Sequence, residues 1–161
     1  MNRRTFVSAF AGLFAAVKAT DAAAQPKPAG EKIEKLVLKP DEWKKRLTPE
    51  QYAVLREEAT ERPGSSPLNG EKRKGLYACA GCDLPLFSSE AKYESGTGWP
   101  SFHSAIPGRV GTRTDFKLIY PRTEYHCIRC GGHQGHVFDD GPPPTGKRFC
   151  NNGVALKFVP A

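Results

Sequence analysis

The sequence predicts a mainly β protein, in which small antiparallel sheets follow one or two short helices. Three observations support this fold class. The 161 residues include 16 Gly and 14 Pro, which divide the second half of the chain into short segments. Several of these segments are apolar, and the last of them, residues 154–159, alternates as a strand does. Two Cys-x-x-Cys pairs also indicate a metal site that joins distant parts of one domain.

The first 24 residues have the layout of a secretory signal. Two arginines at positions 3 and 4 precede an apolar stretch from Phe6 to Val17, and small residues follow it. The apolar stretch is about half as long as a bilayer-spanning helix, so we expect no stable membrane insertion. The paired arginines resemble a twin-arginine signal, which predicts export to the periplasm and cleavage after Ala24. An uncleaved anchor and an amphipathic or disordered tail are the alternatives.

A linker and a single domain are expected after the signal. Residues 25–40 mix prolines with charges and are interpreted as the linker. The domain then spans residues 41–161, and a short helical stretch begins at its start, at Asp41-Glu42-Trp43.

A second helix is predicted from Thr48 to about Ala59. Thr48 can cap this helix, Pro49 suits its first position, and Gln51 can reach back to the cap. We expect Tyr52, Leu55 and Ala59 to face inward.

Short apolar segments after Gly75 are the candidate strands. They lie at residues 76–78, 118–120, 136–138 and 154–159. Three consecutive prolines between Gly141 and Gly146 predict an irregular loop there, because proline cannot donate to a strand ladder.

The net charge of +7 does not indicate a nucleic-acid partner. The basic residues are scattered, and the densest run, residues 71–74, is interpreted as a solvated loop. Nothing in the sequence indicates an assembly larger than a monomer.

Four of the five cysteines form the predicted metal site. Cys79 and Cys82 make one pair, and Cys127 and Cys130 make the other. Two such pairs supply the four thiolates that a tetrahedral structural Zn²⁺ requires. Iron is an alternative, and so are disulfides, although a bridge within either pair would close too short a loop to stabilise much. His126 could replace one ligand.

The fifth cysteine, Cys150, has no such partner and is the candidate nucleophile. Arg148 and Lys147 precede it, and nearby cations can lower the pKa of a thiol. His133 and His136 are candidate acid–base partners. From these residues alone, a buried structural thiol with two surface histidines remains open.

Several motifs together resemble the methionine-R-sulfoxide reductases of the B type. The resemblance extends from about residue 42 to residue 159 in unbroken order. It rests on residues 47–52, 60–63 and 95–102, on Cys127-x-x-Cys130, and on the stretches 132–138 and 148–152.

The resemblance implies a reaction and a set of residue roles. Cys150 would attack the sulfoxide sulfur of oxidised methionine in proteins or peptides and become a sulfenic acid. His133 and His136 would help to protonate the sulfoxide oxygen, and Asn152 would support this network. Trp99 and Phe138 would contact the substrate. The implied fold is a pair of antiparallel sheets with peripheral helices and a zinc site away from the active site.

One position departs from the family pattern. Many members carry a resolving cysteine where this chain has Thr97, and the other four cysteines are assigned to zinc. We therefore expect a thioredoxin-like protein or a small-molecule thiol to reduce the sulfenic acid. A zinc cysteine acting as the resolver is the alternative.

Two other functions compete with this enzyme activity. They are a non-catalytic zinc-binding module and a zinc–thiolate redox switch.

Overall fold

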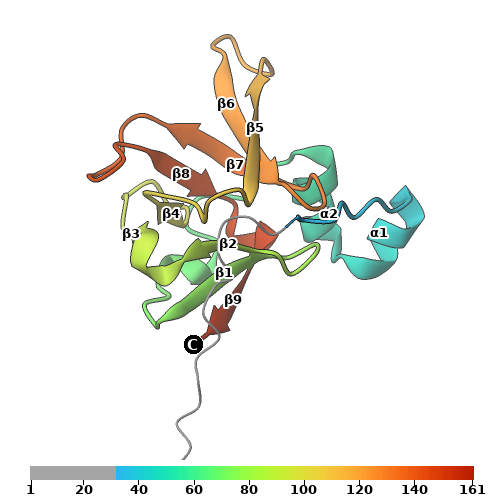
Figure 1. Cartoon of the computed structure of the whole chain (residues 1–161). Helices are drawn as coiled ribbons and strands as arrows, with labels where there is room; N and C mark the ends of the chain where they lie inside the picture. The colour runs from blue at the N-terminus through green and yellow to red at the C-terminus, as the bar shows by residue number, and fades with distance from the viewer. Residues whose placement is uncertain (1–31) are drawn as a thin grey trace, which may run out of the picture.

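The computed structural model describes residues 32–161 (Figure 1). The signal predicted at residues 1–24 and the linker residues 25–31 lie outside the described residues. Two helices come first, α1 (Pro40–Arg46) and α2 (Pro49–Glu57). The strands that follow are β1 (Gly75–Cys79), β2 (Pro85–Ser88), β3 (Lys92–Tyr93), β4 (Ser101–Phe102), β5 (Val110–Asp115), β6 (Arg122–Cys127), β7 (His133–Phe138), β8 (Arg148–Asn151) and β9 (Leu156–Pro160). Three short 3₁₀ helices are η1 (Pro67–Asn69), η2 (Ser89–Ala91) and η3 (Gly153–Ala155).

The strands form two antiparallel sheets, as predicted. The smaller sheet has the order β2-β1-β9, and the larger has the order β3-β4-β8-β7-β6-β5. The helices lie together at one side of the molecule in Figure 1, and α2 packs against β7 and η3. Within residues 32–161, no helix is long and apolar enough to cross a membrane.

The predicted capping of α2 is confirmed. The Gln51 amide donates to Thr48 Oγ1 at 3.2 Å, and the Thr48 amide donates to Gln51 Oε1 at 3.1 Å. The helix ends at Glu57, two residues before the predicted end, because Glu58 adopts a left-handed conformation with φ 58°. Leu55 is buried as expected, whereas Tyr52 is partly buried at the edge of the core. Ala59 is exposed, contrary to expectation, because it lies beyond the end of the helix.

Two of the predicted strands differ from the structure. Residues 118–120 form no strand: the last β5–β6 pair joins Asp115 to Arg122, so residues 116–121 are the connection between these strands. Residues 154–155 belong to η3, and β9 begins only at Leu156. The loop at residues 141–146 is irregular as predicted and connects β7 to β8.

The segment before α1 packs on the domain. The Leu36 amide donates to the Arg129 carbonyl at 2.8 Å, and Lys35 Nζ donates to the Ile128 carbonyl at 2.6 Å. This part of the expected linker therefore lies against the second Cys-x-x-Cys turn.

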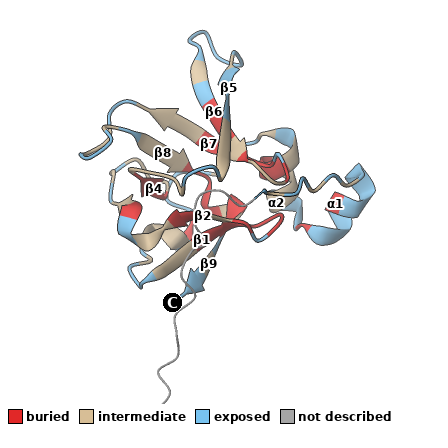
Figure 2. Ribbon diagram, viewed as in Figure 1, coloured by how far each residue is buried: buried red, intermediate tan, exposed pale blue. Residues whose placement is uncertain are grey.

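Buried residues concentrate in β1, β2 and β4 (red in Figure 2), and an aromatic cluster in this core supports β8. Phe87 stacks on Phe102 with ring centroids 4.2 Å apart, and Tyr125 meets Phe149 edge-on at 5.2 Å. Neighbouring residues of a strand face opposite sides, so Phe149 packs on this cluster while Cys150 faces the other way. The core thereby fixes the strand that carries the candidate nucleophile.

Candidate functional site

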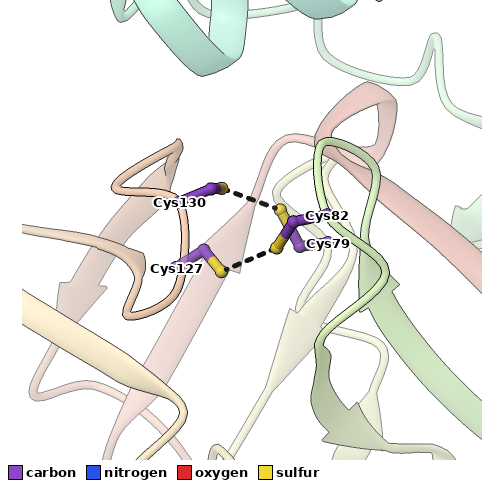
Figure 3. A group of neighbouring side chains, drawn as sticks. All are labelled: Cys79, Cys82, Cys127 and Cys130. Carbon is purple, nitrogen blue, oxygen red and sulfur yellow. Dashed lines mark hydrogen bonds between the residues drawn. The ribbon is translucent and has the colours of Figure 1, made fainter. Parts of the chain in front are cut away.

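The four paired cysteines come together at the junction of the two sheets. Cys79 ends β1 of the smaller sheet and Cys127 ends β6 of the larger one. Figure 3 shows the two turns facing each other with all four sulfurs pointing inward. All four residues are buried, and their Sγ atoms lie within 4.8 Å of one another.

The spacing of these sulfurs fits zinc. Zn–S bonds of about 2.3 Å place the corners of a tetrahedron about 3.8 Å apart. The Cys79–Cys130 and Cys82–Cys127 separations are 3.7 and 3.5 Å, well beyond the roughly 2.0 Å of a disulfide bond. The four cysteines therefore form a zinc site that joins the sheets. His126 is not in this group, and its Nδ1 pairs with Glu124 Oε2 at 3.1 Å instead.

Cys150 lies in a separate pocket of about 130 Å³ on the larger sheet. None of the zinc ligands lines this pocket. Its lining brings together residues from β6, β7 and β8 and from three connections between elements: Thr60, Trp99, Arg122, Gly135, His136, Phe138, Cys150, Asn151 and Asn152. Four of these, Trp99, His136, Phe138 and Asn152, were expected around Cys150 from the sequence.

Burial raises the pKa of the Cys150 thiol above its ordinary value. The Arg148 cation and the Thr97 hydroxyl beside the sulfur lower the pKa, but they do not outweigh the burial. Arg148 therefore lowers the pKa of Cys150 as expected, but the pKa is raised overall. Lys147 is not among the groups that shift this pKa, and it forms an ion pair with Asp139.

A bulge in β7 places both histidines on one face of the sheet. In a regular strand, residues three apart point to opposite faces. Here Tyr125 pairs with Gly135 while His126 pairs with His133, so Gln134 is an extra residue in β7. The His133 and His136 rings consequently lie 5.5 Å apart. His136 is opposite Cys150 across the β7–β8 pair, and only His136 of the two histidines lines the pocket.

Each histidine is held by a carboxylate from another strand: the partly buried Asp115 of β5 holds His136, and the buried Glu124 of β6 holds His133. His136 Nε2 lies 2.7 Å from Asp115 Oδ2, and His133 Nδ1 lies 2.8 Å from Glu124 Oε1. Burial would raise the pKa of Glu124, but hydrogen bonds from His126 and His133 outweigh it and hold the pKa at about 2. The pKa of Asp115 is also lowered, by hydrogen bonds from the Lys117 amide and His136.

These ionised carboxylates fix which ring nitrogen carries the proton. A carboxylate can only accept, so His136 Nε2 donates to Asp115 and leaves Nδ1 as an acceptor. Burial lowers the pKa of His136 despite the bond to Asp115, so the ring is neutral near pH 7. Arg122 Nη2 donates to the same oxygen, Asp115 Oδ2, at 2.7 Å. The buried Nε of Arg122 has no hydrogen-bond partner.

The Trp99 wall is held by the chain between α2 and η1. Trp99 Nε1 donates to the Glu61 carbonyl at 3.1 Å, and the Glu61 carboxylate accepts the Gly153 amide at 2.5 Å. Asn152 accepts the Glu61 amide at 3.0 Å and donates from Nδ2 to the Gln134 carbonyl at 3.0 Å. Asn152 thus ties the Trp99 wall to the β7 bulge, and its side chain makes no bond to either histidine.

Phe138 also lines the pocket, and its ring supports the cation near Cys150. The Arg148 guanidinium stacks over the Phe138 ring at 4.4 Å and donates to both Asp140 oxygens at 2.8 Å. Phe138 therefore both lines the pocket and positions Arg148.

Comparison with known proteins identifies the family. Residues 47–160 match the SelR domain family. The chain is 57% identical over 119 residues to peptide methionine sulfoxide reductase MsrB of Methanosarcina barkeri, which covers 73% of this chain and 84% of that protein. The chain belongs to the B-type methionine sulfoxide reductases.

Two eukaryotic members of this B-type family are also similar. Methionine-R-sulfoxide reductase B2, mitochondrial, of Rattus norvegicus is 52% identical over 136 residues, which cover 79% of this chain and 78% of that protein. Peptide methionine sulfoxide reductase B1, chloroplastic, of Arabidopsis thaliana is 50% identical over 138 residues, which cover 83% of this chain and 68% of that protein. The family resemblance seen in the motifs is thereby confirmed.

Sequence reasoning missed the charged residues that hold the B-type site together. Asp115, Arg122 and Glu124 come from β5 and β6, where alternating polar residues are typical of any exposed strand. Glu61 lies within a stretch that was recognised only as a family motif. Their sequence signal was weak because each acts through a partner on another element.

Proposed function

We propose that this protein reduces the R epimer of methionine sulfoxide in proteins and peptides to methionine, as an oxidoreductase with Cys150 as nucleophile. One observation carries the proposal. Cys150, His136 and Trp99 meet in a small pocket, in a chain of the B-type family. A non-catalytic zinc-binding module would not need this set of groups.

The reaction balances with the Cys150 thiol alone. The bond between oxygen and the methionine sulfur breaks, and oxygen forms a bond to Cys150 Sγ. Cys150 becomes a sulfenic acid that carries the former thiol proton, and methionine leaves as a thioether. The indole face of Trp99 is an apolar surface suited to the methyl group on the substrate sulfur.

His136 is the proposed carrier of the proton. Its unprotonated Nδ1 takes the thiol proton and leaves the more nucleophilic thiolate, and Asp115 stabilises the resulting imidazolium. The imidazolium then protonates the sulfoxide oxygen. His133 acts behind His136, where Glu124 fixes its orientation. The guanidinium of Arg122, which also lines the pocket, would stabilise the sulfoxide oxygen.

An external thiol completes the proposed cycle. Thr97 lies beside Cys150, where a resolving cysteine would be needed, and the remaining four cysteines surround the zinc site. Two thiol equivalents, from a thioredoxin-like protein or a small molecule, would convert the sulfenic acid to thiol and water and would themselves be oxidised to a disulfide. The role of zinc is structural, since it holds together the turns after β1 and β6.

The proposed setting is the periplasm. The twin-arginine-like layout of residues 1–24 supports export, with cleavage after Ala24. The exported domain would act there as a monomer on oxidised proteins.

The test uses the chain from Gln25 onward, dithiothreitol and the two separated epimers of a methionine sulfoxide peptide. We expect consumption of the R epimer alone. Cys150→Ser is the matched control, and it should keep zinc and fold while losing all turnover. A folded, zinc-loaded protein that consumes neither epimer would contradict the proposal and favour the binding-module alternative.

A further inference from the structure

We propose that the tip of the β5–β6 hairpin, residues 116–120, binds the apolar polypeptide that flanks methionine sulfoxide in a protein substrate. This inference rests on the proposed function and adds a recognition surface outside the pocket.

The tip concentrates exposed apolar side chains. Among the described residues, four of the six exposed large apolar side chains lie here: Phe116, Leu118, Ile119 and Tyr120. Ile119 is 94% exposed and Tyr120 is 77% exposed. The hairpin projects from the rest of the molecule in Figures 1 and 2, so none of the described elements covers it. Contiguous apolar patches of this kind mark interaction sites in soluble proteins.

Polar contacts hold the base of the tip in place. Asp115 Oδ1 accepts the Lys117 amide at 2.8 Å, and Lys117 Nζ pairs with Glu58 Oε2 at 2.5 Å. Arg113 also pairs with Glu58, at the end of α2. The apolar side chains are thus presented from an anchored turn, which lowers the entropy cost of binding a partner.

The same hairpin is continuous with the pocket. Asp115 binds His136, and its cross-strand partner Arg122 lines the pocket. Every residue of the tip lies within about three positions of Asp115 or Arg122 along the chain, which corresponds to a distance of roughly 10 Å. An extended chain with its sulfoxide in the pocket therefore places residues about three positions away against the tip.

The chemistry of the substrate accounts for an apolar docking surface. Methionine fills apolar cores, and its oxidation to the polar sulfoxide disrupts the packing around it. A damaged protein therefore exposes methionine sulfoxide together with apolar neighbours. The tip matches those neighbours, and the pocket takes the sulfoxide.

The test compares a long and a minimal substrate. One is a peptide of about a dozen residues with the R-sulfoxide between Leu and Val residues, and the other is N-acetyl-methionine-R-sulfoxide. For Leu118→Ser/Ile119→Ser we expect the KM of the peptide to rise about tenfold at unchanged kcat, since apolar contacts are lost. The KM of the blocked amino acid should not change.

Val159→Ser is the matched control, because Val159 is an exposed apolar residue on β9 of the other sheet. It should leave both KM values unchanged. Equal KM values for variant and wild type on the long peptide would overturn the inference. So would a variant whose only defect is weaker binding to anionic phospholipid vesicles, which would assign the tip to a membrane. A wild-type protein inactive on both substrates would overturn the proposed function and this inference together.

Discussion

Cys150 is a thiol whose surroundings oppose its ionisation. Burial raises its pKa, and only the Arg148 cation and the Thr97 hydroxyl counteract this. A raised pKa keeps the thiol protonated near pH 7, so reactivity towards substrate depends on a base within the pocket. The neutral His136 ring, opposite Cys150, is placed to be that base.

Removing the Arg148 cation should raise the pKa of Cys150 further. For Arg148→Met we expect the midpoint of the pH profile for iodoacetamide alkylation to move upward by about one unit, and the rate at pH 8 to fall about tenfold. Arg148→Lys keeps the charge and should stay closer to wild type. An unchanged or lower midpoint in the Met variant would contradict this account of the thiol.

Thr97 is placed to serve as a resolving position. Its hydroxyl lies beside the Cys150 sulfur. For Thr97→Cys we expect one turnover without reductant to give an intramolecular disulfide, whereas wild type gains one oxygen atom, as mass spectrometry can distinguish. Ser65→Cys, in a loop outside the Cys150 pocket, should behave as wild type. A stable disulfide in the wild-type protein would instead show that a zinc cysteine resolves the sulfenic acid.

At the scale of elements, the pairing of β7 with β8 depends on a glycine next to the β7 bulge. A Cβ on Gly135 would lie 1.9 Å from the Cys150 carbonyl oxygen. Gly135→Ala must therefore push β7 away from β8, and we expect a loss of about 2–4 kcal/mol in the free energy of unfolding. Denaturant titration measures this, with Gly70→Ala as the control, because no atom lies within 4 Å of a Cβ there. Equal stability of the two variants would mean that the β7–β8 pair is not tightly constrained.

The elements that were predictable from sequence are those with local determinants. The capping box of α2 involves only residues three apart, so Thr48 and Gln51 predict the start of the helix. Residues 118–120 look like a strand because they are apolar, yet they form a hairpin tip. Apolar composition alone does not distinguish a buried strand from an exposed interaction surface.

The candidate site was predictable through its motifs but not through its supports. The Cys-x-x-Cys spacing of the two cysteine pairs indicates a metal site by itself. Trp99, His136 and Phe138 were identified through the family resemblance. The β7 bulge brings His133 and His136 to one face, and the sequence gives no sign of it because the bulge depends on pairing with β6. Asp115 and Glu124 act across strands for the same reason.

At the scale of the whole molecule, the zinc site connects the two sheets. It joins the end of β1 to the end of β6, and Gln134 Nε2 donates to Cys79 Sγ at 3.4 Å. The backbone carbonyl of Gln134 also accepts the Asn152 amide at 2.8 Å. Zinc binding is therefore coupled to the pocket through the β7 bulge.

Loss of zinc should destabilise the whole domain. For Cys79→Ser we expect zinc content well below one ion per chain and a fall in Tm of roughly 10 °C or more, because metal binding energy contributes to folding. Cys150→Ser should keep both the metal and the Tm of wild type. Elemental analysis and thermal denaturation test this, and a metal-free Cys79 variant with a wild-type Tm would contradict it.

The zinc site also closes the chain into a ring. Cys79 and Cys82 precede the β5–β6 hairpin tip, and Cys127 and Cys130 follow it. A protease that cuts at the exposed tip therefore opens the ring without releasing a fragment, because each fragment keeps two of the four cysteines that bind the ion. The β1–β9 and β4–β8 pairs also join the two fragments, so a nicked molecule can pass for an intact one until it is denatured and the metal is removed.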